Sequence, residues 1–198
     1  MIAARELPRA GRRAAARMFG DAFVDDPGWI DTGPDSRRRR WQFARRVCGG
    51  EIRAAPRVGG RVLATFDDGV PSAVIVWYPP EVRASLRLLA AVAPGAVLAG
   101  PAVVRRGLLS QGVLDAGHPV EPHVFVSLLA VDPRFQRGGR GRALLNAAIA
   151  AAVRLNVATY LDTANPDNLP YYRSFGFALT GEARLPRGAP LWYLLRAP

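Results

Sequence analysis

The 198-residue chain carries 27 basic residues, all of them arginine, against 16 acidic ones, for a formal net charge of +11. A complete lack of lysine beside abundant alanine, glycine and proline is typical of a GC-rich coding bias, so the charge is weak evidence for a nucleic-acid partner and we expect none. The length fits a single domain over 1–198, and the one cysteine, Cys48, excludes an intrachain disulfide and fits a reducing, cytoplasmic compartment.

Two helices are predicted in the first quarter of the chain. Apolar residues at helical spacing indicate the first over 7–23, and no unbroken apolar run follows its arginines, so we expect no secretory leader. Turn formers fill 24–36 (VDDPGWIDTGPDS), which is predicted to be a loop ending in a capping residue. A second helix is expected through 37–48. Its Arg37–Arg40 run is interpreted as a solvated side, with phosphate binding as the weaker alternative.

A hairpin and a helical block come next. Two strand-like runs, 61–66 and 71–78, flank an Asp-Asp-Gly turn at 67–69 and predict the hairpin. The alanine-rich block 81–117 is predicted to be a helical insert. Its most apolar run, 88–104, falls short of the roughly 20 residues of a membrane-spanning helix and is broken twice by proline and glycine. We therefore expect two buried helices or a helical hairpin, in a position to cover a substrate cleft, and no membrane contact.

The rest of the chain alternates between strand and helix patterns. The predicted elements are a strand at 122–131, a helix at 140–155, a strand at 157–164, a short helix at 168–176 and a strand pair at 177–185 and 190–197.

The strand-to-helix junction after 122–131 holds three glycines among arginines. Glycine lets a ligand approach the main chain, and the first N–H groups of a helix lie unpaired at the positive end of its dipole. Such amides form a ready anion site, and arginine can hold phosphate oxygens in bidentate fashion. We therefore predict that this glycine loop is a phosphate or pyrophosphate cradle made of Gln136, Arg137, Gly138, Gly139, Arg140, Gly141 and Arg142.

Three phosphate-binding patterns compete for the glycine loop. A P-loop needs a lysine, and the chain has none. A dinucleotide fingerprint fits Gly139 and Gly141 but meets Leu144 at its third small position, although Asp162 falls near the place of a ribose-binding acid. That leaves a nucleotide-binding oxidoreductase as a weaker alternative. The pattern Q/R-x-x-G-x-G/A fits 136–141 in full. A glycine turn that binds nothing is the remaining interpretation.

On this strand and loop the chain resembles the GCN5-related N-acetyltransferase (GNAT) superfamily, in which the loop holds the pyrophosphate of acetyl-coenzyme A. The stretch LDTANPDNLPYYRSFGF (161–177) is similar to the last motif of that family, a strand followed by an asparagine-bearing helix and Y-x-x-x-G-F. The layout is closest to the puromycin N-acetyltransferase group. The shared features are an early AF with an acidic-proline stretch after it (here AFVDDP), WYPPE before the helical insert, EPH at the central strand, NLPYYRSFGF and an ending LPRGAPLWYL. The chain departs in its first strand, reduced to the stub MIAAREL, and in the alanine- and proline-rich insert.

The resemblance implies an α/β (α+β) fold with a central mixed, mostly antiparallel sheet, splayed at its central strands, flanked by helices and carrying the helical insert before the central strand. It implies transfer of an acetyl group from acetyl-coenzyme A to a primary amine of a small molecule by direct attack in a ternary complex. A non-catalytic acyl-coenzyme A binding or sensor module is the alternative. The acceptor stays open among antibiotics, polyamines, amino acids and protein N-termini, as does the choice between monomer and homodimer.

The resemblance also assigns residues to the cofactor. The main chain of Leu129, Ala130 and Val131 would bind the pantetheine arm, and a backbone N–H there would stabilise charge on the thioester oxygen. Asn165 and Asn168 match polar positions that touch the cofactor in relatives. Each assignment has a plain alternative: the three apolar residues suit a buried strand, and asparagine often caps a helix.

Tyr172 matches the tyrosine that gives a proton to the departing thiolate, which suits a hydroxyl that is protonated at neutral pH. Its neighbour Tyr171 is interpreted as a packing residue. Asp25, Asp26 and Trp29 lie on the loop that borders the acceptor site in relatives. The base for the amine is open among Glu121, His123, Asp25, Asp26 and Ser127, the last by holding a water. Neither histidine has the spacing of a metal ligand, so no metal is expected.

Overall fold

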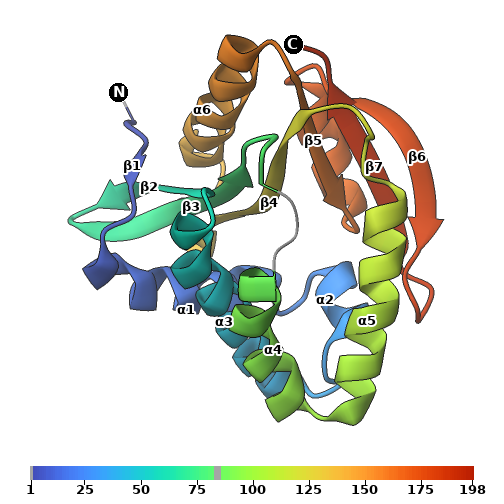
Figure 1. Cartoon of the computed structure of the whole chain (residues 1–198). Helices are drawn as coiled ribbons and strands as arrows, with labels where there is room; N and C mark the ends of the chain where they lie inside the picture. The colour runs from blue at the N-terminus through green and yellow to red at the C-terminus, as the bar shows by residue number, and fades with distance from the viewer. Residues whose placement is uncertain (1, 83–85) are drawn as a thin grey trace.

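The structure is a computed structural model that describes residues 2–82 and 86–198, without the side chains of 86–89. Its strands form one seven-stranded sheet in the order β1-β2-β3-β4-β5-β7-β6 (Figure 1). The strands are β1 (Arg5–Glu6), β2 (Arg61–Asp67), β3 (Val70–Tyr78), β4 (His123–Val131), β5 (Ala158–Thr163), β6 (Ala178–Arg184) and β7 (Pro190–Arg196). The helices are α1 (Arg12–Phe23), α2 (Pro27–Thr32), α3 (Arg37–Ala54), α4 (Leu86–Ala99), α5 (Pro101–Ala116), α6 (Arg140–Leu155) and α7 (Leu169–Arg173).

The sheet confirms the predicted fold class. Among the described strands, β4 and β5 are the one parallel pair, and the other five pairs are antiparallel. A dinucleotide-binding fold is built on a mostly parallel sheet, so the oxidoreductase alternative is wrong for this architecture. The predicted hairpin is β2–β3. Asp68 and Gly69 at its tip both have positive φ, 45° and 77°, as a two-residue type I′ turn requires.

The sheet opens between β4 and β5. The two strands pair only where His123–Phe125 faces Ala158–Tyr160, so the rest of β4 has no strand partner on the β5 side. At the same place the β3–β4 register shifts, because Val76 pairs with Leu128 and Trp77 with Val126. Ser127 is therefore the extra residue of a β-bulge, a feature that bends a strand and re-aims its side chains. The predicted splay of the central strands is confirmed.

Helices cover both faces of the sheet (Figure 1). On one face, Leu144, Leu145 and Ala148 of α6 are buried against β3 and β5. On the other face, Phe19 of α1 and Ile52 of α3 pack on the same two-sided strand β3. A third cluster joins Tyr160 of β5 to Leu191 and Tyr193 of β7, and α5 packs against it. Three helices of the N-terminal half and the helical insert thus lie beside the opening between β4 and β5.

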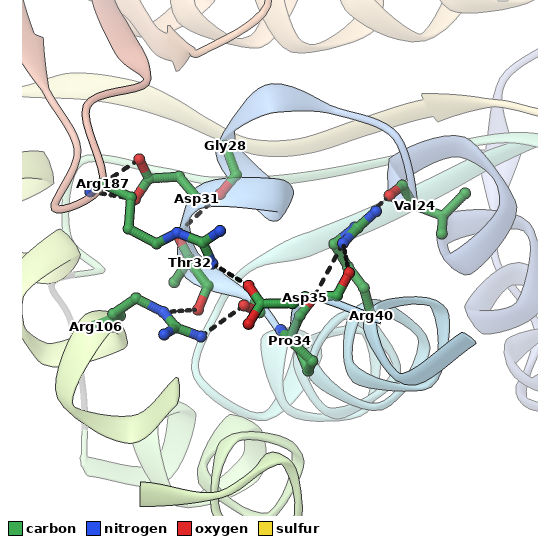
Figure 2. Close-up of polar contacts among 10 residues, drawn as sticks. Val24, Gly28, Asp31, Thr32, Pro34, Asp35, Arg40, Arg106 and Arg187 are labelled. Atoms are coloured by element: carbon green, nitrogen blue, oxygen red, sulfur yellow. Dashed lines mark hydrogen bonds and ion pairs between the residues drawn. The ribbon is translucent and has the colours of Figure 1, made fainter. Parts of the chain in front are cut away.

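Three details differ from the sequence-based expectation. The predicted loop 24–36 contains α2, because Asp26 and Pro27 form a helix N-terminus and not only a turn. Arg40 is 7% exposed and is not part of a solvated side (Figure 2). The insert is a helical hairpin, but several of its apolar side chains face solvent and are not buried: Val97, Leu98, Leu108 and Leu109. No helix within the described ranges is long and apolar enough to cross a membrane.

Candidate active site

A cavity of about 570 Å³ lies where β4 and β5 part, and we call it the splay cavity. Its walls come from α1, α2, α3, α4, α5 and α7 together with β4, β5 and β7. Most of the described lining is apolar, including Phe23, Trp29, Phe43, Val47, Val92, Ala96, Val97, Val104, Leu108, Leu114, Leu128, Leu161, Leu185 and Leu191. The polar side chains that line it are Asp26, Thr32, Gln111, Ser127, Asp162, Thr163, Asn168 and Tyr172.

Tyr172 lies on the short helix α7 and is buried at the edge of the splay cavity. Its ring packs edge-on against Phe177, with 5.9 Å between ring centroids. Burial is the main reason why the pKa of its hydroxyl lies above the ordinary value, and Tyr171, Asp162 and Asp26 raise that pKa further. The hydroxyl therefore stays protonated at neutral pH and can act as a proton donor.

The bulge residue Ser127 joins the splay cavity to a buried carboxylate. Its hydroxyl donates a hydrogen bond of 2.6 Å to Oε1 of Glu51 on α3, and the hydroxyl of Tyr78 donates to the same oxygen at 3.1 Å. Burial raises the pKa of Glu51, while these two hydrogen bonds lower it. Because Ser127 gives its only hydrogen to Glu51, it meets a cavity ligand as a hydrogen-bond acceptor.

Two further carboxylates line the splay cavity, in different environments. Asp26 caps α2, with Oδ1 accepting from the main-chain N–H of Gly28 at 2.9 Å and of Trp29 at 3.4 Å. Asp162 lies on β5, where burial raises its pKa to about 7. Within the described part of the chain, no group donates a hydrogen bond to Asp162. The Asp26 carboxylate thus caps α2, whereas the Asp162 carboxylate faces the cavity without a partner among the described residues.

The wall formed by α2 is fixed from three sides (Figure 2). Asp31, only 3% exposed, accepts hydrogen bonds from the main-chain N–H of Arg187 at 3.0 Å and of Ala189 at 2.9 Å in the β6–β7 turn. Arg106 of α5 donates to the carbonyl oxygens of Thr32 and Gly33 at 3.1 and 2.7 Å. These contacts hold the cavity wall in place before any ligand binds.

Arg40 provides the third attachment of this wall. From α3 it donates to the carbonyl oxygens of Val24, Pro34 and Asp35 at 2.6, 3.0 and 2.9 Å. A guanidinium that satisfies three carbonyls can be buried without a carboxylate partner. This is the physical reason why one arginine of the Arg37–Arg40 run does not face solvent.

The glycine loop follows the free end of β4. Arg137 and Gly139 have positive φ, 60° and 78°, and α6 begins directly after them. In the described chain, no turn, loop or cap hydrogen bond uses the main-chain N–H of Gly138 or Gly139. A Cβ at Gly141 would lie 3.0 Å from the Tyr171 hydroxyl oxygen, so only glycine fits there without displacing a neighbour.

The arginine side chains of this loop are partly engaged. The Arg140 guanidinium pairs with Asp67 at 2.9 Å, donates to Ser72 at 3.1 Å and lies over the ring of Phe135. Arg142 lies over the ring of Phe175, with 4.7 Å from guanidinium carbon to ring centroid. The Arg140 side chain is therefore already paired in this structure, and its main-chain N–H is what remains for a ligand.

A family model described as the acetyltransferase (GNAT) family matches residues 63–177. The chain belongs to the GNAT acetyltransferase family. The matched range begins in β2 and ends after α7, so it contains the splay, the glycine loop and Tyr172. Membership makes the chain an acyltransferase, as the sequence predicted, and members of the GNAT family use acetyl-coenzyme A.

Solved GNAT structures share the whole fold. One is described as histone acetyltransferase HPA2 and related acetyltransferase from Corynebacterium glutamicum, with 21% identity, 100% of this chain and 97% of that chain covered, and a TM-score of 0.73. Another is the polyamine N-acetyltransferase of Drosophila melanogaster, with 13% identity, full coverage of both chains and a TM-score of 0.69. At such identities the likeness establishes the GNAT fold.

The structure brings together part of the predicted site. Six predicted residues line the splay cavity: Asp26, Trp29, Ser127, Leu129, Asn168 and Tyr172. Asp25 does not, because it is exposed and paired with Arg37 at 2.8 Å. Glu121 is also exposed, and His123 is absent from the described lining. Ala130, Val131 and the glycine loop continue along β4 toward α6, and Asn165 caps the turn before α7.

Sequence reasoning missed two carboxylates of this GNAT site. The sequence pattern marks Asp162 only as a ribose-binding acid, although its place as the one charged residue of strand 157–164 is a signal for a buried functional carboxylate. Glu51 lies beyond the predicted end of the second helix and gave no signal. The packing of α3 against the bulge of β4 decides its role.

Proposed function

We propose that the chain is an acetyl-coenzyme A-dependent N-acetyltransferase that acts on the primary amine of a small molecule by direct attack in a ternary complex. The observation that carries this proposal is the splay cavity, where the unpaired edge of β4, a protonated tyrosine and an unpaired carboxylate meet. Its volume of about 570 Å³ is within the usual range for small-molecule sites, roughly 300–1,000 Å³. Family membership supports acyl transfer, and the size of the cavity supports a small acceptor.

The glycine loop fits the diphosphate of acetyl-coenzyme A, which supplies an acetyl group activated as a thioester. Its unused main-chain N–H groups and the first turn of α6 present hydrogen-bond donors at the positive end of a helix dipole. Arg137 and Arg142 add charge beside them, and Arg140 contributes its main-chain N–H. In an antiparallel pair, N–H groups point alternately toward and away from the partner, so the β3–β4 pairing leaves every second amide of Leu129–Val131 for the pantetheine arm.

Tyr172 is the general acid in this proposal. Its raised pKa keeps the proton on the hydroxyl until the thiolate leaves, and its place on the cavity wall lets it reach the sulfur. A main-chain N–H of β4 would stabilise negative charge on the thioester oxygen. Asn168, which donates to the Thr163 hydroxyl at 3.2 Å, holds the start of α7 against β5.

The test is release of free thiol from acetyl-coenzyme A with a panel of primary amines, alongside thermal unfolding with acetyl-coenzyme A and with NAD(P). We expect acetyl-coenzyme A to raise the unfolding temperature and at least one small amine to release thiol. Binding without turnover on a broad panel would favour the non-catalytic acyl-coenzyme A module. Stabilisation by NAD(P) alone would contradict the proposal.

A further inference from the structure

Asp162 differs from the other carboxylates near the splay cavity in what its oxygens contact. Asp25 pairs with Arg37, Asp26 caps α2, and Glu51 accepts two hydroxyl hydrogen bonds. For Asp162, burial is the one cause of its raised pKa, and within the described chain no donor compensates it. Its carboxylate is therefore available to a molecule in the cavity.

The cavity also lacks a cation of its own in the part that the structure describes. The chain has 27 arginines, yet no arginine and no histidine is among the described lining residues. An ionised carboxylate facing apolar walls is unfavourable unless a cation pairs with it. A positive charge that completes this site must therefore arrive with the ligand.

We propose that Asp162 receives the ammonium group of the acceptor and takes its proton, and that the apolar remainder of the splay cavity selects an amine with one cationic group on a hydrocarbon body. This inference rests on the proposed N-acetyltransferase function and names its base and its substrate class. Ser127 supports it, because its hydroxyl presents acceptor lone pairs to the cavity and can accept a second N–H of the ammonium group.

The proton transfers balance as follows. The ammonium group gives one proton to the Asp162 carboxylate and becomes a neutral amine. The amine nitrogen then forms a bond to the acetyl carbonyl carbon, the carbon–sulfur bond breaks, and the thiolate takes the proton of the Tyr172 hydroxyl. The second proton lost by the nitrogen restores Tyr172, and Asp162 releases its proton to solvent. The products are an amide, free coenzyme A thiol and one proton in solution.

The walls around Asp162 indicate the substrate class. Trp29 stacks on Phe23 with ring centroids 5.3 Å apart and meets Phe43 edge-on at 5.6 Å, which makes a rigid aromatic wall. The insert adds aliphatic side chains from α4 and α5. Asp26 is the other carboxylate of the described lining, and its cap hydrogen bonds already occupy one oxygen. A second ammonium group on the acceptor would therefore lose its hydration and gain few hydrogen bonds or ion pairs in return.

The groups around Asp162 set the pH dependence. The hydroxyls of Tyr160, Tyr172 and Tyr193 sense its charge, and the pKa of each is raised, so all three stay neutral near pH 7. The pKa of Asp26 is also raised by burial, and the rings of His118 and His123 pack against Tyr160. With a pKa of about 7, Asp162 gains its charge as the pH rises through neutrality, so activity rises with it.

The substrate class is tested with phenethylamine, hexylamine, agmatine and spermidine as acceptors in the free-thiol assay. We expect kcat/KM for the two monoamines to exceed that for the two polycations by about tenfold or more. A preference for agmatine or spermidine would overturn the inference and leave N-acetyl transfer intact. No thiol release with any amine, while acetyl-coenzyme A still binds, would overturn the proposed function and this inference with it.

The role of Asp162 is tested by Asp162→Asn, with Glu182→Gln on β6 as an exposed control in the same sheet. We expect Asp162→Asn to lower kcat/KM for phenethylamine about 100-fold and to remove the rise through neutral pH, while the control leaves both unchanged. Acetyl-coenzyme A affinity and thermal unfolding establish that the variant is folded, and Asp162→Ser provides a second, smaller replacement. Activity of both variants within twofold of the parent, or an unchanged pH profile, would overturn the inference.

Discussion

The glycine loop and the splay cavity both adjoin β4, but they are built from different groups. The glycine loop offers main-chain N–H groups from one contiguous run, 136–142, held by two positive-φ residues and the start of α6. The splay cavity offers side chains from nine elements spread over most of the chain. The first suits a group that every reaction shares, because backbone amides bind any diphosphate. The second suits a group that varies between acceptors, because each wall can change separately.

The largest effect is expected in the glycine loop. Gly139→Asp places a side chain at φ 78° and a negative charge beside the expected diphosphate. We expect acetyl-coenzyme A affinity to fall about 100-fold, or about 2.7 kcal/mol, by isothermal titration calorimetry. Gly112→Asp on α5, where a side chain meets open space, is the control. Similar affinities for the two variants would contradict the cradle assignment.

Two adjacent tyrosines, Tyr171 and Tyr172, distinguish proton donation in the splay cavity from simple packing. Tyr172→Phe removes the proposed proton donor, and we expect kcat to fall about 10- to 100-fold with little change in acetyl-coenzyme A affinity. Tyr171→Phe removes a buried hydroxyl that has no partner in the described chain, so kcat and stability should stay close to those of the parent. Steady-state kinetics on both variants would show the difference. Equal losses would assign the effect to packing.

The preformed wall of the splay cavity predicts a smaller effect. Asp31→Asn weakens the hydrogen bonds to the β6–β7 turn and should lower the free energy of unfolding by about 1–3 kcal/mol and raise the KM for the amine. Asp35→Asn removes one exposed ion pair with Arg187 and should change stability by less than about 1 kcal/mol. Denaturant titration and amine KM values separate the two, and an unchanged amine KM in Asp31→Asn would argue against a wall set by α2.

The smallest effect concerns the stability of the free protein. The pKa of Asp162 is raised in the folded state, so the folded chain binds more protons than the unfolded chain between about pH 4 and 7, and stability falls as the pH rises through this window. Asp162→Asn removes this fall in stability, because asparagine does not ionise. Its unfolding temperature should exceed that of the parent at pH 8 and match it near pH 4, as measured by differential scanning fluorimetry. A variant that is less stable at pH 8 would show that Asp162 is compensated.

Local signals explain what could be predicted from the sequence. The elements and the glycine loop follow from periods of 2 and 3.6 residues and from glycine at positive φ, which act within a few residues. Helix α2 was missed because an Asp-Pro-Gly sequence fits both a turn and a capped helix start. The roles of Glu51, Arg40 and Asp162 depend on neighbours far away in the chain. The closer likeness to the puromycin N-acetyltransferase group, and a single domain over 1–198, stay predictions.

The position of the helical insert has an evolutionary consequence. The insert leaves the sheet after Tyr78 and returns before His123, and Tyr78 pairs directly with Phe125 in the β3–β4 ladder. Both ends of the insert are therefore held by two neighbouring strands, β3 and β4. Replacing this helical insert with another one would leave the β3–β4 pairing, the bulge at Ser127 and the glycine loop intact. In this architecture the insert can be replaced to accommodate a different acceptor, while the loop proposed to hold the acetyl donor stays in place.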